Sequence, residues 1–240
     1  MSIRLYLDFA INDQIVPLNK KQANYLARVL KLKNNQIIKV FNGINGEFEG
    51  VFKSDNKDFH IEISTQIAAL SNPNTLNLCY APVKNVKTDF IAKKAAELGV
   101  TSIQPIITDY TVIRKVNQEK LRLSMIEGIE QCRRNDLISI KPIITLKKFL
   151  QSDAEQVILF FDETGKGSLP NQIAEELKTL QNNNITVLIG PEGGFSKQEA
   201  ALIRQTNNQI SLSLGPRILR ADTAIIAACS IVNSYCNNWQ

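Results

Sequence analysis

Residues 185–224 read ITVLIGPEGGFSKQEAALIRQTNNQISLSLGPRILRADTA, and this stretch decides the fold. Two apolar segments, TVLIG and ISLSLG, each end in a glycine-proline turn, and each turn leads into a helical pattern. In an α/β protein such turns bring strand ends and helix starts together at one edge of the sheet, where small molecules bind. The adjacent glycines Gly193 and Gly194 permit backbone angles closed to other residues and let a ligand approach the main chain. The stretch therefore predicts a ligand pocket.

The two turns carry helix-start signals but no standard phosphate loop. Ser196 followed by Glu199 fits a capping box, and Asp222 or Thr223 is suited to cap the last helix. Neither GxGxxG nor GxxxxGK[ST] is present, which favours a ligand held by apolar contacts and backbone hydrogen bonds. Taken alone, GPEGGFS is also explained as a tight strand-to-helix turn.

From about residue 73 onward, apolar strands alternate with helical patterns. The predicted strands outside 185–224 cover 76–83, 101–108 and 156–163, and the predicted helices cover 86–99, 119–136, 169–181 and 221–236. This alternation predicts a mostly parallel sheet with helices on both faces.

The first 72 residues show a different pattern. Short segments of alternating polarity at 3–9, 36–42, 46–53 and 59–67 predict strands, and VFNGINGEFEG predicts a hairpin. Residues 19–33 predict a basic helix whose Ala23, Leu26, Ala27 and Leu30 share one face. We expect a small β-barrel or half-barrel, with a linker at 68–76 and a domain boundary near Asn72.

Composition limits the function. The chain has 240 residues, 44% apolar and 21% charged, with a net charge of +5, which is compatible with nucleic acid but not diagnostic of it. It has no run of 18 apolar residues and no signal-peptide pattern, so we expect a cytoplasmic protein. Four scattered cysteines without CxxC and a single histidine, His60, disfavour a metal site and Ser-His or Cys-His hydrolysis, and favour free buried thiols.

GPEGGFS followed about 20 residues later by LGPRILRADTA resembles the C-terminal signatures of the SPOUT-type RNA methyltransferases. More narrowly, the chain is similar to the family that methylates N3 of a uridine in 16S ribosomal RNA (the RsmE family). ANYLARVLKLKNNQIIKVFNG resembles that family's N-terminal domain, and KKAAELGVTSIQPI and EGIEQCRRN resemble its middle motifs, so the likeness extends over essentially the whole chain. The resemblance implies an α/β fold with a PUA-like RNA-binding β-barrel domain at 1–72 and a SPOUT methyltransferase domain with a C-terminal trefoil knot at 73–240.

The resemblance also implies S-adenosylmethionine as the cofactor, held in a bent conformation by the knot. By family analogy the knot loops are the end of VILFFDE, the turn 190–194 and the segment 214–219. The implied cofactor-binding residues are Leu188, Ile189, Gly190, Glu192, Gly193, Gly194, Leu214, Gly215, Ile218 and Leu219. The adenine is expected between side chains and main-chain groups of Ile189, Gly190, Leu214 and Leu219. A homodimer with the site close to the subunit interface is also implied.

Three motifs depart from the family's common pattern. Asn24 and Tyr25 stand where a histidine is frequent, Arg133 replaces a glycine in EQCRR, and Asp222 replaces a glutamate in RADTA.

The implied reaction suggests roles for charged residues. Arg220 is our candidate for stabilising negative charge on the uracil carbonyls, because a guanidinium stays charged and forks its donors. Asp222 or Glu192 is a candidate for accepting or orienting the N3 proton, although acids at helix starts and turns also serve those structures. The expected contacts to 16S ribosomal RNA in the small ribosomal subunit are Arg4, Arg28, Lys31, Arg133, Arg134 and Arg217.

Other functions remain open at the level of sequence. A SPOUT enzyme acting on ribose 2′-oxygen or another base is one, and a non-catalytic RNA-binding assembly factor is another. A nucleotide-dependent oxidoreductase ranks last, since its glycine fingerprint is missing.

Overall fold

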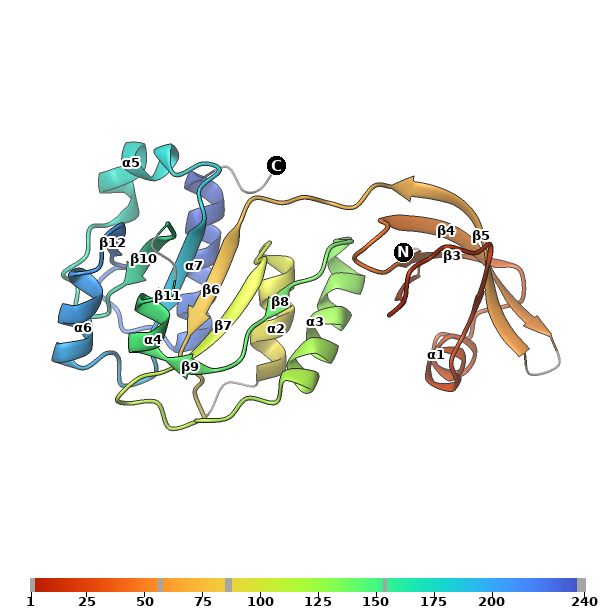
Figure 1. Ribbon diagram of the computed structural model, residues 1–240, viewed down its shortest axis with the longest axis horizontal. Helices are drawn as coiled ribbons and strands as arrows, with labels where there is room; N and C mark the ends of the chain where they lie inside the picture. Colours follow the sequence, from red (N-terminus) through yellow and green to blue (C-terminus); the bar gives the residue numbers. More distant parts are fainter. Residues whose placement is uncertain (1–2, 56–57, 85–87, 153–154, 237–240) are drawn as a thin grey trace. The chain divides into compact units, whose positions relative to one another are not determined.

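The computed structural model describes residues 3–55, 58–84, 88–152 and 155–236. The chain divides into two compact units (Figure 1). One contains residues 1–72 together with 129–137, and the other contains 73–128 together with 138–240. The segment 129–137 thus belongs with the N-terminal unit, whereas the sequence assigned it to the second domain.

The N-terminal unit is built on a five-stranded mixed sheet in the order β1-β3-β4-β5-β2. Its strands are β1 (Arg4–Tyr6), β2 (Ile15–Pro17), β3 (Gln36–Phe41), β4 (Glu47–Asp55) and β5 (Asp58–Ala68). β1 pairs with β3 in parallel, and the other pairs are antiparallel. The β3–β4 hairpin confirms the turn prediction, and Gly43 and Gly46 both adopt positive φ there. The sequence did not predict β2, an edge strand, where Pro17 is tolerated.

The basic helix is α1 (Lys20–Asn24) followed by one turn of π-helix, η1 (Tyr25–Val29). Asn19 and Gln22 form a capping box at its start, and the Leu30 N–H donates to the Tyr25 carbonyl, five residues back, at 2.9 Å. A π-turn contains more residues than an α-turn, so later side chains rotate away from the apolar face. Leu26 is fully buried, but Leu30 is exposed, and the prediction that Leu30 shares the buried face is wrong.

The C-terminal unit contains a parallel sheet in the order β12-β10-β11-β6-β7-β8, with β9 also paired to β7. Its strands are β6 (Leu76–Tyr80), β7 (Ser102–Ile107), β8 (Ser139–Ile140), β9 (Ile144–Thr145), β10 (Val157–Phe161), β11 (Ile185–Ile189) and β12 (Gln209–Leu212). Every pairing in it is parallel, which confirms the predicted α/β arrangement.

Helices cover both faces of this sheet (Figure 1). They are α2 (Thr88–Glu97), α3 (Gln118–Cys132), α4 (Leu146–Leu150), the 3₁₀ turn η2 (Pro170–Ile173), α5 (Ala174–Thr179), α6 (Lys197–Arg204) and α7 (Ala221–Tyr235). α4 and α6 lie on one face, and α7 lies on the other. None of the helices in the described ranges is both long and apolar enough to cross a membrane.

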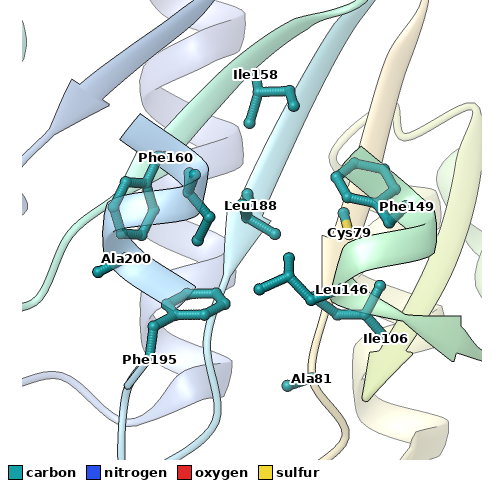
Figure 2. Close-up of a cluster of buried hydrophobic side chains, with 11 residues drawn as sticks. Cys79, Ala81, Ile106, Leu146, Phe149, Ile158, Phe160, Leu188, Phe195 and Ala200 are labelled. Atoms are coloured by element: carbon teal, nitrogen blue, oxygen red, sulfur yellow. The ribbon is translucent and has the colours of Figure 1, made fainter. Parts of the chain in front are cut away.

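A buried apolar cluster joins α4 and α6 to the sheet. Figure 2 shows Phe160 of β10 and Leu188 of β11 among its members, with Phe195 below them. The Phe160 and Phe195 rings meet edge to face, with centroids 5.4 Å apart. Since strand side chains alternate between faces, Phe161 and Ile189 point to the opposite side, where α7 lies.

Candidate functional site

A pocket lies where β10, β11 and β12 end and α7 begins. These three strands are adjacent and parallel, so their carboxyl ends share one edge of the sheet. The pocket is open to solvent and has a cavity volume of about 70 Å³. It is lined by Phe161, Asp162, Glu163, Ile189, Gly190, Pro191, Glu192, Gly194, Leu214, Gly215, Arg217, Ile218, Leu219, Ala221 and Ala224. The strand ends and turns of residues 185–224 therefore meet around one cavity.

Most of the residues expected to bind the cofactor line this pocket. They are Ile189, Gly190, Glu192, Gly194, Leu214, Gly215, Ile218 and Leu219. Leu188 does not, because strand alternation places it in the cluster under α4 and α6. Gly193 does not either, since a Cβ added there would face Tyr110 at 3.4 Å.

The expected cofactor-binding residues leave out seven of the fifteen residues that line the pocket. Phe161, Asp162 and Glu163 come from the end of β10, and Ala221 and Ala224 come from α7. Family analogy places a knot loop at the end of VILFFDE, but the sequence alone does not show which of its side chains face the pocket. Arg217, expected on RNA, also lines the pocket.

The glycine turn after β11 is closely packed. Gly194 has a φ of +69°, and a Cβ there would lie 1.9 Å from Glu163 Oε1. That oxygen accepts the Phe195 N–H at 3.2 Å. A Cβ on Gly190 would lie 2.8 Å from the Phe195 ring. The Phe195 ring at Gly190, and the positive φ together with Glu163 at Gly194, therefore favour glycine at both positions.

Asp162 anchors the loop that follows β10. Its carboxylate accepts the backbone N–H of Thr164 at 2.9 Å and the Thr164 hydroxyl at 2.6 Å, and it pairs with Arg204. Burial acts to raise the pKa of Asp162, but the two Thr164 hydrogen bonds and the Arg204 guanidinium outweigh it and hold the pKa below its ordinary value. Asp162 is therefore an ionised structural group at the base of the pocket.

The helix starts on either side of the pocket differ. Ser196 and Glu199 form the predicted capping box of α6, which is confirmed. Asp109 ties the segment after β7 to this cap, since its carboxylate accepts the Ser196 hydroxyl at 2.6 Å. At α7 the N-cap is Arg220, without a side-chain hydrogen bond, so the prediction of an Asp222 or Thr223 cap is wrong. Asp222 instead lies in the first turn and accepts the Thr223 N–H at 2.8 Å.

The catalytic candidates lie near one another in the chain's fold. Glu192 lines the pocket, whereas Arg220 and Asp222 flank the lining residue Ala221 at the start of α7. Arg220 is exposed and Asp222 is half-buried.

Two arginines expected on RNA are used inside the N-terminal unit. Arg4 is 8% exposed, and its guanidinium donates to Glu47 and to the carbonyls of residues 129, 130 and 134. Arg134 has a side chain 9% exposed and binds Asp136 through two nitrogens, at 2.8 and 2.6 Å. Both guanidiniums hold the segment 129–137 in place, so these two residues are removed from the proposed RNA-binding set.

The remaining cations are accessible. Arg28 in η1, Lys31 after it, Arg133 after α3 and Arg217 in the pocket loop are all exposed. Arg133 and Lys31 adopt positive φ, at +66° and +52°.

The cysteines are free thiols, and Cys79, Cys229 and Cys236 are buried, as expected, while Cys132 is partly buried. Burial raises the pKa of Cys229 to about 12 and that of Cys236 to about 11. Within the described ranges no group of three or more His, Cys, Asp or Glu side chains is placed to hold a metal ion.

Comparison with known proteins identifies the family. A family model described as an RNA methyltransferase domain matches residues 70–233, and one described as an RNA methyltransferase PUA domain matches residues 18–64. The chain is 33% identical over 239 residues to the ribosomal RNA small subunit methyltransferase E of Rickettsia conorii, covering 97% of both proteins. It is 31% identical to the protein of the same name from Buchnera aphidicola of Schizaphis graminum, covering 94% of this chain and 93% of that one.

Solved structures agree. A methyltransferase of Legionella pneumophila in complex with the bound cofactor SAM has a TM-score of 0.83 and 27% identity, with 98% of each chain covered. A ribosomal RNA small subunit methyltransferase E from Neisseria gonorrhoeae, 24% identical with a TM-score of 0.84 and 98% of each chain covered, shows the same fold. The predicted fold class is confirmed: a PUA-like mixed sheet is followed by a SPOUT-like α/β methyltransferase fold. The chain belongs to the RNA methyltransferase family of the ribosomal RNA small subunit methyltransferases E.

Proposed function

We propose that this protein transfers a methyl group from S-adenosylmethionine to N3 of a uridine in 16S ribosomal RNA of the small subunit. The observation that carries the proposal is the single pocket formed by GPEGGFS after β11 and LGPRILR after β12. Its wall combines apolar side chains, which suit an adenosyl group, with two glycine-containing turns. Carboxylates at its edge suit a cationic ligand.

We also propose that the pocket loops form the family's trefoil knot, with the end of β10, the turn 190–194 and the segment 214–219 as its loops. The meeting of these three segments around one cavity supports this assignment. Tracing the backbone in an experimental structure tests it.

In the proposed reaction, bound S-adenosylmethionine supplies an electrophilic methyl group on its sulfonium. The apolar walls and turns hold the donor so that uracil N3 can be aligned with that methyl, and positioning of this kind supplies up to roughly 7–11 kcal/mol of barrier reduction in favourable cases. Arg220 is exposed beside the pocket and stabilises negative charge on the uracil carbonyls. Glu192 or Asp222 accepts or orients the N3 proton. A base within folded RNA is flipped out to reach the pocket.

The role of Arg220 is tested by Arg220→Ala. We expect a loss of methylation of about 10²–10³-fold, typical of removing one charge-stabilising donor, with unchanged donor affinity by calorimetry. Lys178→Ala, an exposed cation on α5, is the matched control. Normal turnover by Arg220→Ala would exclude Arg220 from the mechanism.

Arg28, Lys31, Arg133 and Arg217 form the proposed RNA-binding set, supported by their exposure. We further propose a cytoplasmic homodimer. Its support is Ile218, a lining residue of the pocket that is 85% exposed and would be covered by a second subunit. Sedimentation equilibrium tests this, since a monomer at micromolar concentration would contradict it.

Two alternatives have separate tests. For a SPOUT enzyme with another target, nucleoside mass spectrometry of ribosomal RNA from a deletion strain decides, because unchanged 3-methyluridine rules out the proposed target. For a non-catalytic assembly factor, calorimetric titration with S-adenosylmethionine decides, because that factor would show no binding.

A further inference from the structure

Glu163 is a pocket residue that the sequence did not single out. It follows Asp162 directly at the end of β10 and lines the cavity. Its Oε1 accepts the Phe195 N–H, and the same oxygen occupies the space that a Cβ on Gly194 would need. One oxygen of the carboxylate is therefore held against the glycine turn, which fixes the negative charge at the pocket wall.

That charge is not neutralised by the protein. Asp162 next to it is paired with Arg204, but no Lys or Arg nitrogen in the described ranges lies within 4.0 Å of the Glu163 carboxylate. The Glu163 side chain is exposed, so solvent and salt screen its charge until a ligand in the pocket covers it.

The donor and the product of methyl transfer differ in one charge. When the S–CH₃ bond breaks, its electron pair stays on sulfur, the methyl bonds to N3, and the N3 proton leaves. The sulfonium becomes an uncharged thioether, while the adenosine and amino-acid parts stay the same. A carboxylate close to the sulfur therefore distinguishes the two ligands by charge alone.

We propose that Glu163 is a specificity-determining residue that favours the sulfonium-bearing donor over the thioether product. This inference rests on the proposed assignment of the pocket as the donor site. Its consequence is that methyl transfer itself weakens the attraction to Glu163, so that product exchanges for fresh donor.

The test is calorimetry on wild-type protein and Glu163→Gln with three ligands. These are S-adenosylmethionine, its thioether product S-adenosylhomocysteine, and sinefungin, which carries a protonated amine in place of the methylated sulfonium. Glutamine keeps the shape and an oxygen that accepts the Phe195 N–H. We expect about three- to fivefold weaker binding of the two cationic ligands and unchanged binding of the product, since an exposed charge pair changes an affinity by up to about fivefold.

Equal loss for all three ligands, or no change for any, would overturn the proposal. Glu176→Gln on α5 removes an exposed carboxylate outside the pocket lining and should leave all three affinities unchanged. A second measurement needs no variant. In wild-type protein, the ratio of the affinity for the donor to that for the product should fall as NaCl is raised from about 0.05 to 0.5 M, because salt screens the Glu163 charge. A preference independent of salt would also contradict the role of Glu163.

Ala224→Phe separates this inference from the proposed function. Its larger ring fills the pocket from α7 and should abolish binding of all three ligands. Unchanged binding by Ala224→Phe would show that the donor lies elsewhere. If Ala224→Phe abolishes binding and Glu163→Gln weakens all three ligands equally, only the role of Glu163 is refuted.

Discussion

Gly194 combines two features that favour glycine: a left-handed backbone conformation and a neighbour that fills the space of a Cβ. The residue has a φ of +69°, and Glu163 occupies the space beside it. Gly165 has a similar φ of +72°, but nothing lies within 4 Å of a Cβ added there. Substituting Gly165 therefore tests backbone strain alone, whereas substituting Gly194 tests backbone strain together with a steric clash.

We therefore expect Gly165→Ala to lower the free energy of unfolding by about 1–2 kcal/mol through strain alone. Gly194→Ala should lower it by up to about 1 kcal/mol more and should weaken donor binding, because the Glu163 carboxylate must move and lose its hydrogen bond to the Phe195 N–H. Chemical denaturation and calorimetry measure the two effects. Equal destabilisation by both substitutions would contradict the close packing of Glu163.

Asp162 predicts a dependence of stability on pH. Its folded-state pKa lies below the ordinary value of 3.8, so folding stabilises the ionised form. That contribution is present above the unfolded-state pKa and is lost as the pH falls through the lowered folded-state pKa. Asp162→Asn should therefore cost about 1–3 kcal/mol at pH 7, and its difference from wild type should shrink as the pH falls below 3.8.

Urea denaturation at several pH values checks this, with Glu176→Gln as an exposed control. A difference that stays constant from neutral pH into the acid range would show that Asp162 acts through shape and not through charge.

The residues alone predicted a pocket at these turns, and the family resemblance supplied most of its expected lining. Gly194 was singled out because adjacent glycines let a ligand approach the main chain, whereas Gly190 came from the resemblance. Leu188 packs in the core instead of lining the pocket, because a short, fully apolar strand such as ITVLI does not reveal which residues face which side. Arg4 and Arg134 were taken for surface cations, since a sequence does not show that a guanidinium is enclosed by carbonyls from a distant segment.

At the scale of elements, the helices and strands with a strong hydrophobic periodicity were the ones that the sequence predicted. The three strands that frame the pocket were all expected, as were α2, α3, α6 and α7. The sequence did not predict β8, β9 and α4, which are two, two and five residues long. Elements this short show no periodic pattern, and tertiary packing determines where they form. The π-turn at η1 was also missed, since its sequence is that of an ordinary amphipathic helix.

The end of α3 offers an element-scale prediction. Arg133 follows the last helical residue and has a φ of +66°, a conformation that favours glycine after a helix. This position is also where the chain departs from the family's glycine. Arg133→Gly should raise the free energy of unfolding by about 0.5–1 kcal/mol, while weakening RNA binding if Arg133 contacts phosphate.

Thermal unfolding and RNA binding at fixed salt measure the two effects. Asn182→Gly, at a φ of +69°, is the control, and it should gain less because asparagine tolerates this conformation. Lower stability in Arg133→Gly would mean that the arginine side chain stabilises the fold.

At the scale of the whole molecule, the chain leaves the N-terminal unit after Asn72 and returns to it for residues 129–137. Arg4 connects residues 1–72 to residues 129–137 within the N-terminal unit, because its guanidinium donates to three carbonyls of the returning segment. Sequence patterns located the first boundary but gave no sign of the return, which depends on this long-range contact.

Arg4→Met should leave Glu47 without its partner and three carbonyls without a donor. We expect the N-terminal unit to lose about 3–5 kcal/mol of stability, while the pocket in the other unit still binds donor. Hydrogen exchange should accelerate in β1, β3 and β4 and remain unchanged in β10 and β11. Arg28→Met, at an exposed site on η1, is the control; similar acceleration in both variants would contradict the role of Arg4.

The return of residues 129–137 to the N-terminal unit has a consequence for synthesis on the ribosome. At about 5–20 residues per second, Leu137 emerges roughly 3–13 s after Asn72. During that interval Arg4 has no carbonyls from residues 129–134 to bind. The N-terminal unit is therefore translated first but cannot complete its fold until residues 129–137 have been synthesised. A nascent chain stalled before residue 129 should therefore be cut readily by protease within its first 72 residues.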